Sequence, residues 1–207
     1  MASLLLQVEI GQANELSSEP KSGSANLDWL RKPVNVQRLI EEKSILVSVK
    51  SSNDDWSLSG AGLVSARIDF VNQAVFQASR LKAASSQVEA VRFLQRDAKS
   101  GSFEVQFQIL GKIKKMTVEI EQVPGMTGPS ITYHWRVLLG AFAGSKGSLV
   151  LIDRGQHAVL VEFQGQHHEG IRWVPNFILA IAVEGFMKSV ATSWRKNLES
   201  DYLHSIR

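Results

Sequence analysis

Apolar and polar residues alternate over most of the chain between residues 44 and 165. The first two alternating segments are residues 44–52 (SILVSVKSS) and 56–68 (WSLSGAGLVSARI), separated by a turn signal. Alternation with a period of two is typical of strands that bury one face, so the pair predicts a β-hairpin. Gly60 and Gly62 in the second segment indicate a bulge, a close backbone approach or a bend in a curved sheet. A phosphate loop is excluded because no Lys-Ser/Thr follows them.

Six further alternating segments follow, joined by short turn signals rich in Gly, Pro and Ser. They cover residues 88–96, 102–110, 113–122, 130–139, 147–153 and 157–165. Connections this short cannot return the chain to a parallel partner, so the segments predict an antiparallel meander. Alternate apolar positions such as Phe103, Val105 and Phe107 give the sheet one apolar face, which needs a second layer to cover it.

Helical spacing of apolar residues occurs in two places. Residues 69–84 (DFVNQAVFQASRLKAA) predict one amphipathic helix or two short ones. Residues 173–200 predict a long terminal helix that supplies the second layer. Its first part, WVPNFILAIAVEGFMKSVATSW, has about the length of a membrane span, roughly 20 residues. Glu184 and Lys188 interrupt it at a spacing that lets them pair in water, so we interpret it as a helix of a soluble fold.

The composition is typical of one globular domain with an extension. At 207 residues and 44% hydrophobic content, the chain can bury one sizeable core. Residues 11–26 are rich in Ser, Gly, Asn and Pro, as linkers are. We therefore expect a partly flexible N-terminal extension over residues 1–43 and the domain over residues 44–207. The extension could cap a sheet edge, cover a pocket or be disordered.

Charge and cysteine content exclude several function classes. A net charge of +3, from 23 basic and 20 acidic residues spread along the chain, lacks the concentrated basic stripe of a nucleic-acid binder. The absence of cysteine excludes disulfides, thiol catalysis and thiolate metal sites. The N-terminus has no basic flank before its apolar patch, so it is a poor signal peptide. We expect a cytoplasmic protein as the sequence stands, or a periplasmic or secreted one if a leader has been removed.

Two polar groups are candidates for chemistry. His167-His168-Glu169 has the residue types of a metal site, but adjacent histidines point in different directions and no third ligand has a defined spacing, so we expect a solvated loop. His134 could act with Arg136 and Glu162 as acid and base, although its position predicts the strand face opposite Trp135.

The one basic run is Lys112, Lys114 and Lys115. A solvated hairpin is the favoured interpretation of this run. Contact with an anionic surface or a lipid headgroup is the alternative.

The order of these elements resembles the START-like (SRPBCC) superfamily, which has the helix-grip fold. The resemblance covers about residues 44–203 and rests on two passages, ITYHWRVLLGAFAGSKGSLVLIDRGQHAVLVEFQG and IRWVPNFILAIAVEGFMKSVATSWRKNLES. It implies an α+β fold in which a curved antiparallel sheet of about seven strands wraps around a long C-terminal helix. Members include lipid-transfer START domains, polyketide cyclases and coenzyme Q-binding proteins. The segment DFVNQAVFQASRLKAASS departs from many members, which carry a Trp and a Pro there.

Such a fold places an apolar space between sheet and helix, which predicts binding or transport of a hydrophobic, lipid-like molecule without catalysis or a cofactor. The residues predicted to line it, which would show the same pattern in a filled core, are Phe103, Phe107, Trp135, Val137, Phe163, Phe177 and Ile181. A cyclase-like or hydrolase-like enzyme is the first alternative and needs polar side chains that converge inside. A protein-interaction module with a filled core is the second, and a protein partner and the oligomeric state stay open.

Overall fold

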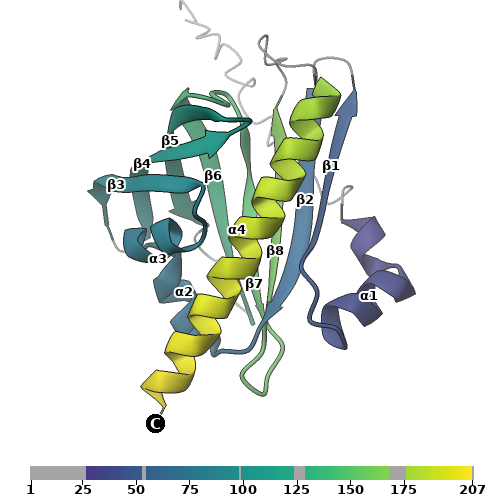
Figure 1. The fold of residues 1–207 in the computed structure, drawn as a ribbon. Coiled ribbons are helices and arrows are strands. Elements are labelled where there is room, and N and C mark those ends of the chain that lie inside the picture. The colour runs from purple at the N-terminus through teal and green to yellow at the C-terminus, as the bar shows by residue number, and fades with distance from the viewer. Residues whose placement is uncertain (1–26, 53–54, 98, 124–128, 168–175, 207) are drawn as a thin grey trace, which may run out of the picture.

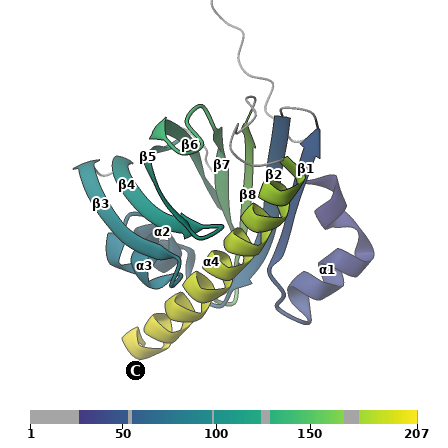
Figure 2. The ribbon, with the colours of Figure 1, turned by 45° about the horizontal axis from the view of Figure 1, so that its top comes forward.

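The computed structural model describes residues 27–52, 55–97, 99–123, 129–167 and 176–206, apart from the side chains at positions 52, 78, 176 and 177. A curved, unclosed antiparallel sheet forms the middle layer (Figures 1 and 2). The long helix α4 (Asn176–Ser205) crosses its concave side, and the short helices η2 (Asp28–Arg31) and α1 (Pro33–Ile40) lie on the other side. This is the expected α+β helix-grip arrangement.

The sheet has eight strands in the order β1-β2-β8-β7-β6-β5-β4-β3. All neighbours are antiparallel, which confirms both the predicted hairpin and the predicted meander. The strands are β1 (Leu46–Ser52), β2 (Asp55–Val64), β3 (Val88–Arg96), β4 (Ser100–Ile109), β5 (Lys112–Gln122), β6 (Ser130–Gly140), β7 (Lys146–Asp153) and β8 (Val159–His167).

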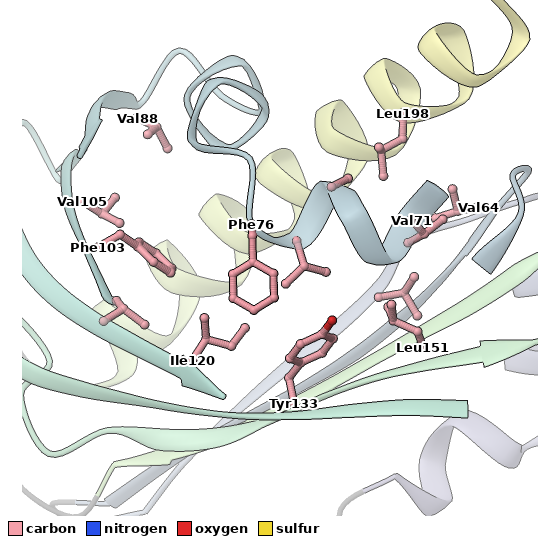
Figure 3. Close-up of a cluster of buried hydrophobic side chains, with 14 of the residues drawn as sticks. Val64, Val71, Phe76, Val88, Phe103, Val105, Ile120, Tyr133, Leu151 and Leu198 are labelled. Carbon is pink, nitrogen blue, oxygen red and sulfur yellow. The ribbon is translucent and has the colours of Figure 1, made fainter. Parts of the chain in front are cut away.

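For residues 69–84 the sequence predicted either one helix or two short ones. The structure has two, α2 (Ile68–Val75) and α3 (Ala78–Ala83). The backbone becomes extended at Gln77, with φ −107° and ψ 102°, and this turn separates the two helices. Phe76 leaves the end of α2 and packs against Tyr133 of β6, with ring centroids 5.6 Å apart (Figure 3). The two helices therefore cover one end of the concave side.

The alternating pattern sets which side chains enter the core. In β4 every second side chain is buried, and these positions include Phe103, Val105 and Phe107. They join buried residues of β5, β6 and α4 in one apolar cluster (Figure 3). The apolar sheet face inferred from the sequence is thus the concave face that α4 covers.

Strand β8 is apolar on both sides because both of its sides are covered. Val159 and Val161 point into the concave cluster, whereas Leu160 packs with the second cluster on the convex side. That second cluster combines residues of η2, α1, β1 and β2, namely Leu30, Leu39, Leu46 and Ala61. The described part of the N-terminal extension therefore packs on the outer side of β1, β2 and β8, while residues 1–26 lie outside the described structure.

Gly60 and Gly62 make room for neighbouring side chains. The pairing of β2 with β1 and β8 continues through both glycines without a register shift, so the bulge interpretation is wrong. A Cβ on Gly60 would overlap the ring of Phe163, and one on Gly62 would overlap Ile45. The close-approach interpretation is confirmed, since a larger residue would have to displace Phe163 or Ile45.

Among the described helices, none combines the length and apolar character needed to cross a membrane. Glu184, in the middle of the apolar stretch, accepts a hydrogen bond from the backbone N–H of Val49 at 3.2 Å. This carboxylate therefore links α4 to the edge strand β1.

Candidate ligand-binding site

The concave face of the sheet and one face of α4 meet through apolar side chains. Leu179 and Val183 of α4 are buried in the cluster. Further apolar side chains are half-buried and form what we call the concave interface. Trp135 and Leu149 from the sheet and Phe186, Met187, Val190 and Trp194 from α4 pack against the same cluster, and Phe163 of β8 lines a small cavity beside α4. An apolar molecule between sheet and helix would contact these side chains.

Trp135 lies over two glycines of the neighbouring strands. Gly147 of β7 and Gly165 of β8 occupy the same register row as Trp135. A Cβ on either glycine would lie 2.6 Å from Cζ2 of the indole. The missing side chains let the ring lie flat across β7 and β8, which gives the concave face a flat aromatic surface.

A small cavity of about 30 Å³ lies between α4 and strands β2 and β8. Phe163, Val161 and Trp194 are among its lining residues. It has room for a water molecule, whereas pockets for small organic ligands span about 300–1,000 Å³. A lipid-like ligand would therefore have to displace half-buried side chains of the concave interface or shift α4.

An aromatic chain crosses the end of the concave side where α4 begins. Phe186 of α4 contacts Phe107 of β4 at 5.7 Å, Phe107 stacks on Phe142 at 6.0 Å, and Phe142 meets Trp56 of β2 edge-on at 5.9 Å, all between ring centroids. Phe142 lies in the loop between β6 and β7 with φ 64°, a left-handed conformation that is rare for an aromatic residue. The loop thus carries Phe142 inward at the cost of backbone strain.

A buried polar cluster, formed by Trp56, Ser145 and His167, lies beside this chain. Ser145 Oγ and His167 Nδ1 share a hydrogen bond of 3.0 Å, and the two residues are only 2% and 5% exposed. The ring of Trp56 stacks on His167 at 5.5 Å. The indole Nε1 of Trp56 is buried and has no hydrogen-bond partner within the described structure. The cluster therefore holds one free donor in apolar surroundings.

Comparison with known proteins gives matches by structure. No protein-family model matches the sequence, and no curated protein matches it. A STAR-related lipid transfer protein from Xanthomonas axonopodis aligns with TM-score 0.63 and 15% identity over 75% of this chain and 94% of that chain. The Zhui aromatase/cyclase of Streptomyces sp. R1128 aligns with TM-score 0.57 and 10% identity over 74% and 96%. Human STARD10 aligns with TM-score 0.57 and 7% identity over 84% and 79%.

The chain has the START-like helix-grip fold. At 7–15% identity the likeness establishes the fold alone, so ligand and reaction have to come from the site itself.

The seven residues predicted to line the ligand space differ in burial and in position. Phe103, Phe107 and Val137 are buried in the core, whereas Trp135 and Phe163 are half-buried on the concave face. The side chain of Phe177 lies outside the described residues. Ile181 is 73% exposed, on the outer side of α4. Their role in ligand contact stays a prediction, and Trp135 and Phe163 have the most suitable positions for it.

His167 differs from its expected place in a solvated loop. That expectation is wrong, because β8 continues to His167, which pairs with Trp56 of β2 and is buried. His168 and Glu169 lie outside the described residues. Within the described ranges, no three His, Asp or Glu side chains gather as a metal site would require. His167 thus belongs to the buried polar cluster.

The other predicted polar group lies on the convex side of the START-like sheet. His134 and Arg136 are exposed, and Arg136 forms an ion pair with Glu119. Burial raises the pKa of Glu162, while the charges of Arg31 and Arg154 lower it. These side chains do not converge with the Ser145 and His167 pair, which faces the concave side.

Tyr133 supplies a second buried polar contact. Its hydroxyl donates a hydrogen bond to Asn72 Oδ1 of α2. Burial raises its pKa to about 12, so the phenol stays protonated at neutral pH. It therefore ties α2 to the sheet and is a poor general base.

Proposed function

We propose that the protein binds an apolar, lipid-like small molecule between the concave face of its sheet and α4, without catalysing a reaction. The observation that carries the proposal is the concave interface, where Phe163 of the sheet and Trp194 of α4 line the same small cavity. Large apolar side chains that stay half-buried beneath a covering helix are suited to contact an apolar guest. The likeness to the Xanthomonas lipid transfer protein and the Streptomyces aromatase/cyclase supports the proposal at the level of fold.

The ligand would enter by moving packed side chains. The cavity of about 30 Å³ is far smaller than a lipid-like molecule, so binding requires rearrangement. Met187 is suited to such a rearrangement, because an unbranched thioether adapts to new surroundings at little cost. We therefore expect ligand binding to reposition α4 side chains and leave the sheet in place.

Native mass spectrometry of the purified protein, followed by extraction and lipid analysis, tests the proposal. We expect a co-purified apolar molecule, or uptake from a panel of lipids, quinones and aromatic polyketides, near one per chain. Met187→Trp should fill the concave interface and weaken uptake by about tenfold or more. Ser189→Trp, at an exposed position of the same helix, should leave uptake unchanged.

The opposite result has a defined meaning. A chain that takes up none of the panel, with no thermal shift, contradicts the proposal and favours the protein-interaction module with a filled core. Equal uptake by the Met187→Trp and wild-type proteins would show that the ligand binds outside the concave interface.

A hydrolase-like enzyme is the second candidate, favoured by the Ser145 and His167 pair. A serine hydroxyl within hydrogen-bond reach of an imidazole is the first requirement of nucleophilic catalysis. The usual arrangement has a carboxylate on Nδ1 and the serine on Nε2, whereas here Nδ1 itself bonds Ser145. Burst hydrolysis of an activated fatty ester that Ser145→Ala abolishes would support this candidate. Equally slow hydrolysis by the wild-type and Ser145→Ala proteins would contradict the hydrolase candidate.

A further inference from the structure

Trp56 carries a buried hydrogen-bond donor without a partner. The residue is 8% exposed, and its Nε1 has no acceptor within the described structure. Buried polar groups nearly always find a partner in native proteins, since an unpaired one loses its hydration without compensation. A ligand bound next to Trp56 could supply the acceptor that Nε1 lacks.

The two other members of the polar cluster bond to each other. The Ser145 hydroxyl and His167 Nδ1 share their hydrogen bond, and the imidazole stacks on the indole of Trp56. Both rings extend from inward-facing positions of paired strands, with Trp56 opposite His167. Among the described residues of this cluster, the indole N–H is thus the buried side-chain donor without a partner.

The polar cluster lies at one end of the row of contacting aromatic rings. The aromatic chain leads from Trp56 through Phe142 and Phe107 to Phe186, which belongs to the concave interface. A molecule whose apolar body lies on that interface would reach the polar cluster with one end.

A second unpaired indole lies at a different place and has a simpler explanation. Nε1 of Trp194 and Nε of Arg195 also lack partners, but both residues line the cavity of about 30 Å³, which has room for a water molecule. Trp194 is moreover half-buried, whereas Trp56 is buried. Water can serve Trp194, so the donor of Trp56 is the more informative one.

The surroundings of the cluster favour an uncharged acceptor. In the described ranges, none of the side chains that stack on or hydrogen-bond to the cluster is a lysine, arginine, aspartate or glutamate. A carboxylate or phosphate would lose its hydration there without a counter-ion, which is far more costly than burying a neutral oxygen. A carbonyl or hydroxyl oxygen needs only the single donor.

Resting on the proposed function, we propose that Trp56 Nε1 donates a hydrogen bond to an uncharged oxygen at one end of the apolar ligand. The ligand class is then a long-chain or ring-shaped apolar molecule with a carbonyl or hydroxyl group, and the Ser145 and His167 pair holds the indole in place. Fatty acids and phospholipid headgroups are excluded from this position.

Three probes of equal chain length test this inference: 2-dodecanone, dodecane and dodecanoate, presented in cyclodextrin and measured by titration calorimetry. We expect the wild-type protein to bind 2-dodecanone about tenfold more tightly than dodecane, the size expected when a buried donor gains its partner. Trp56→Phe keeps an aromatic, though smaller, side chain and removes the donor, so it should abolish this preference and leave dodecane affinity within about twofold. Trp29→Phe is the matched control, since Trp29 Nε1 donates to Ser59 Oγ at 3.0 Å on the convex side.

The outcomes separate the two proposals. Equal affinity for 2-dodecanone and dodecane overturns the inference and keeps the proposed function. Tightest binding of dodecanoate overturns the inference as well, because a charged end is then accommodated. Binding of none of the three probes contradicts the proposed function and the inference together.

An NMR measurement on the wild-type protein avoids dependence on the folding of a variant. The protein has five tryptophans, whose indole N–H signals can be followed separately. We expect one signal to shift downfield with 2-dodecanone but not with dodecane, and the same signal to be missing in Trp56→Phe. Identical spectra with both probes would overturn the inference.

Discussion

The indole of Trp135 lies over Gly147 and Gly165, where a Cβ would overlap it. Neither glycine is required for a turn, because both belong to regular strands. Their role is to leave the concave face free of side chains beneath the ring. The flat aromatic surface therefore depends on residues that do not contact a ligand themselves.

A matched pair of Gly→Ala changes tests this role. In Gly147→Ala the new Cβ would overlap the carbonyl oxygen of Gln164 as well as Trp135, so we expect a loss of about 1–3 kcal/mol of unfolding free energy. In Gly185→Ala, within α4, the Cβ meets no neighbour and should stabilise the protein by about 1 kcal/mol. Urea unfolding measures both. A neutral Gly147→Ala would show that Trp135 and β8 have room to move.

Single residues also mark the limit of what the sequence predicts. Trp56, Phe107, Phe142 and His167 come from four distant parts of the chain and meet because strand pairing aligns them. Local patterns do not report such pairing. The one local signal for Phe142 is its position between Gly140 and Gly144, both with φ 86°, in a tight loop.

At the level of elements, α4 is held differently along its length. Its C-terminal half makes polar contacts with four other segments: Arg195 with the carbonyl of Lys43, Glu199 with the N–H of Ser65, Tyr202 with His157, and both Asn197 and Asp201 with α3, at the carbonyl of Ala83 and the side chain of Arg80. Its N-terminal half contacts the sheet mainly through apolar side chains and through Glu184. The N-terminal half is thus the part that we expect to shift if a ligand binds.

Hydrogen exchange measured by mass spectrometry tests this difference. We expect peptides covering residues 180–190 to exchange faster than those covering residues 194–202 and to slow on ligand binding, because fewer tertiary contacts tie that part of α4 to the rest of the fold. Uniform exchange along α4, unchanged by ligand, would contradict this difference between the two halves of the helix.

The elements themselves were largely predictable. Alternation gave the eight strands, and short turns gave their antiparallel order, because period-two burial and short connections leave few alternatives. The inward face of α4 was harder, since residues 178–183 are all apolar and show no preferred side. This is why Ile181 was predicted to line the site although it lies on the outer side of the helix.

At the scale of the whole molecule, the sheet separates two apolar layers with different roles. On the convex side, η2 and α1 bury Leu30 and Leu39 against β1, β2 and β8. On the concave side, α4 covers side chains that remain half-buried. The convex layer is a closed packing contact, whereas the concave layer is where we propose that an apolar ligand gains contact area.

The sequence of the N-terminal extension does not show which of its residues pack on the convex side of the sheet. Val34 and Ile40 of α1 are exposed while Leu39 is buried, so its apolar residues do not mark one clear face. Trp29 is fixed by Ser59, a residue thirty positions away that nothing in the local pattern indicates.

Photo-crosslinking with a long-chain fatty alcohol that carries a diazirine in mid-chain tests the central claim most directly. The account predicts labelled peptides from β6, β8 and α4, with labelling suppressed by excess unlabelled alcohol, because the alkyl chain is proposed to lie on Trp135, Phe163 and Met187. Labelling confined to outer apolar residues, such as Val34 and Ile40 of α1, would contradict it.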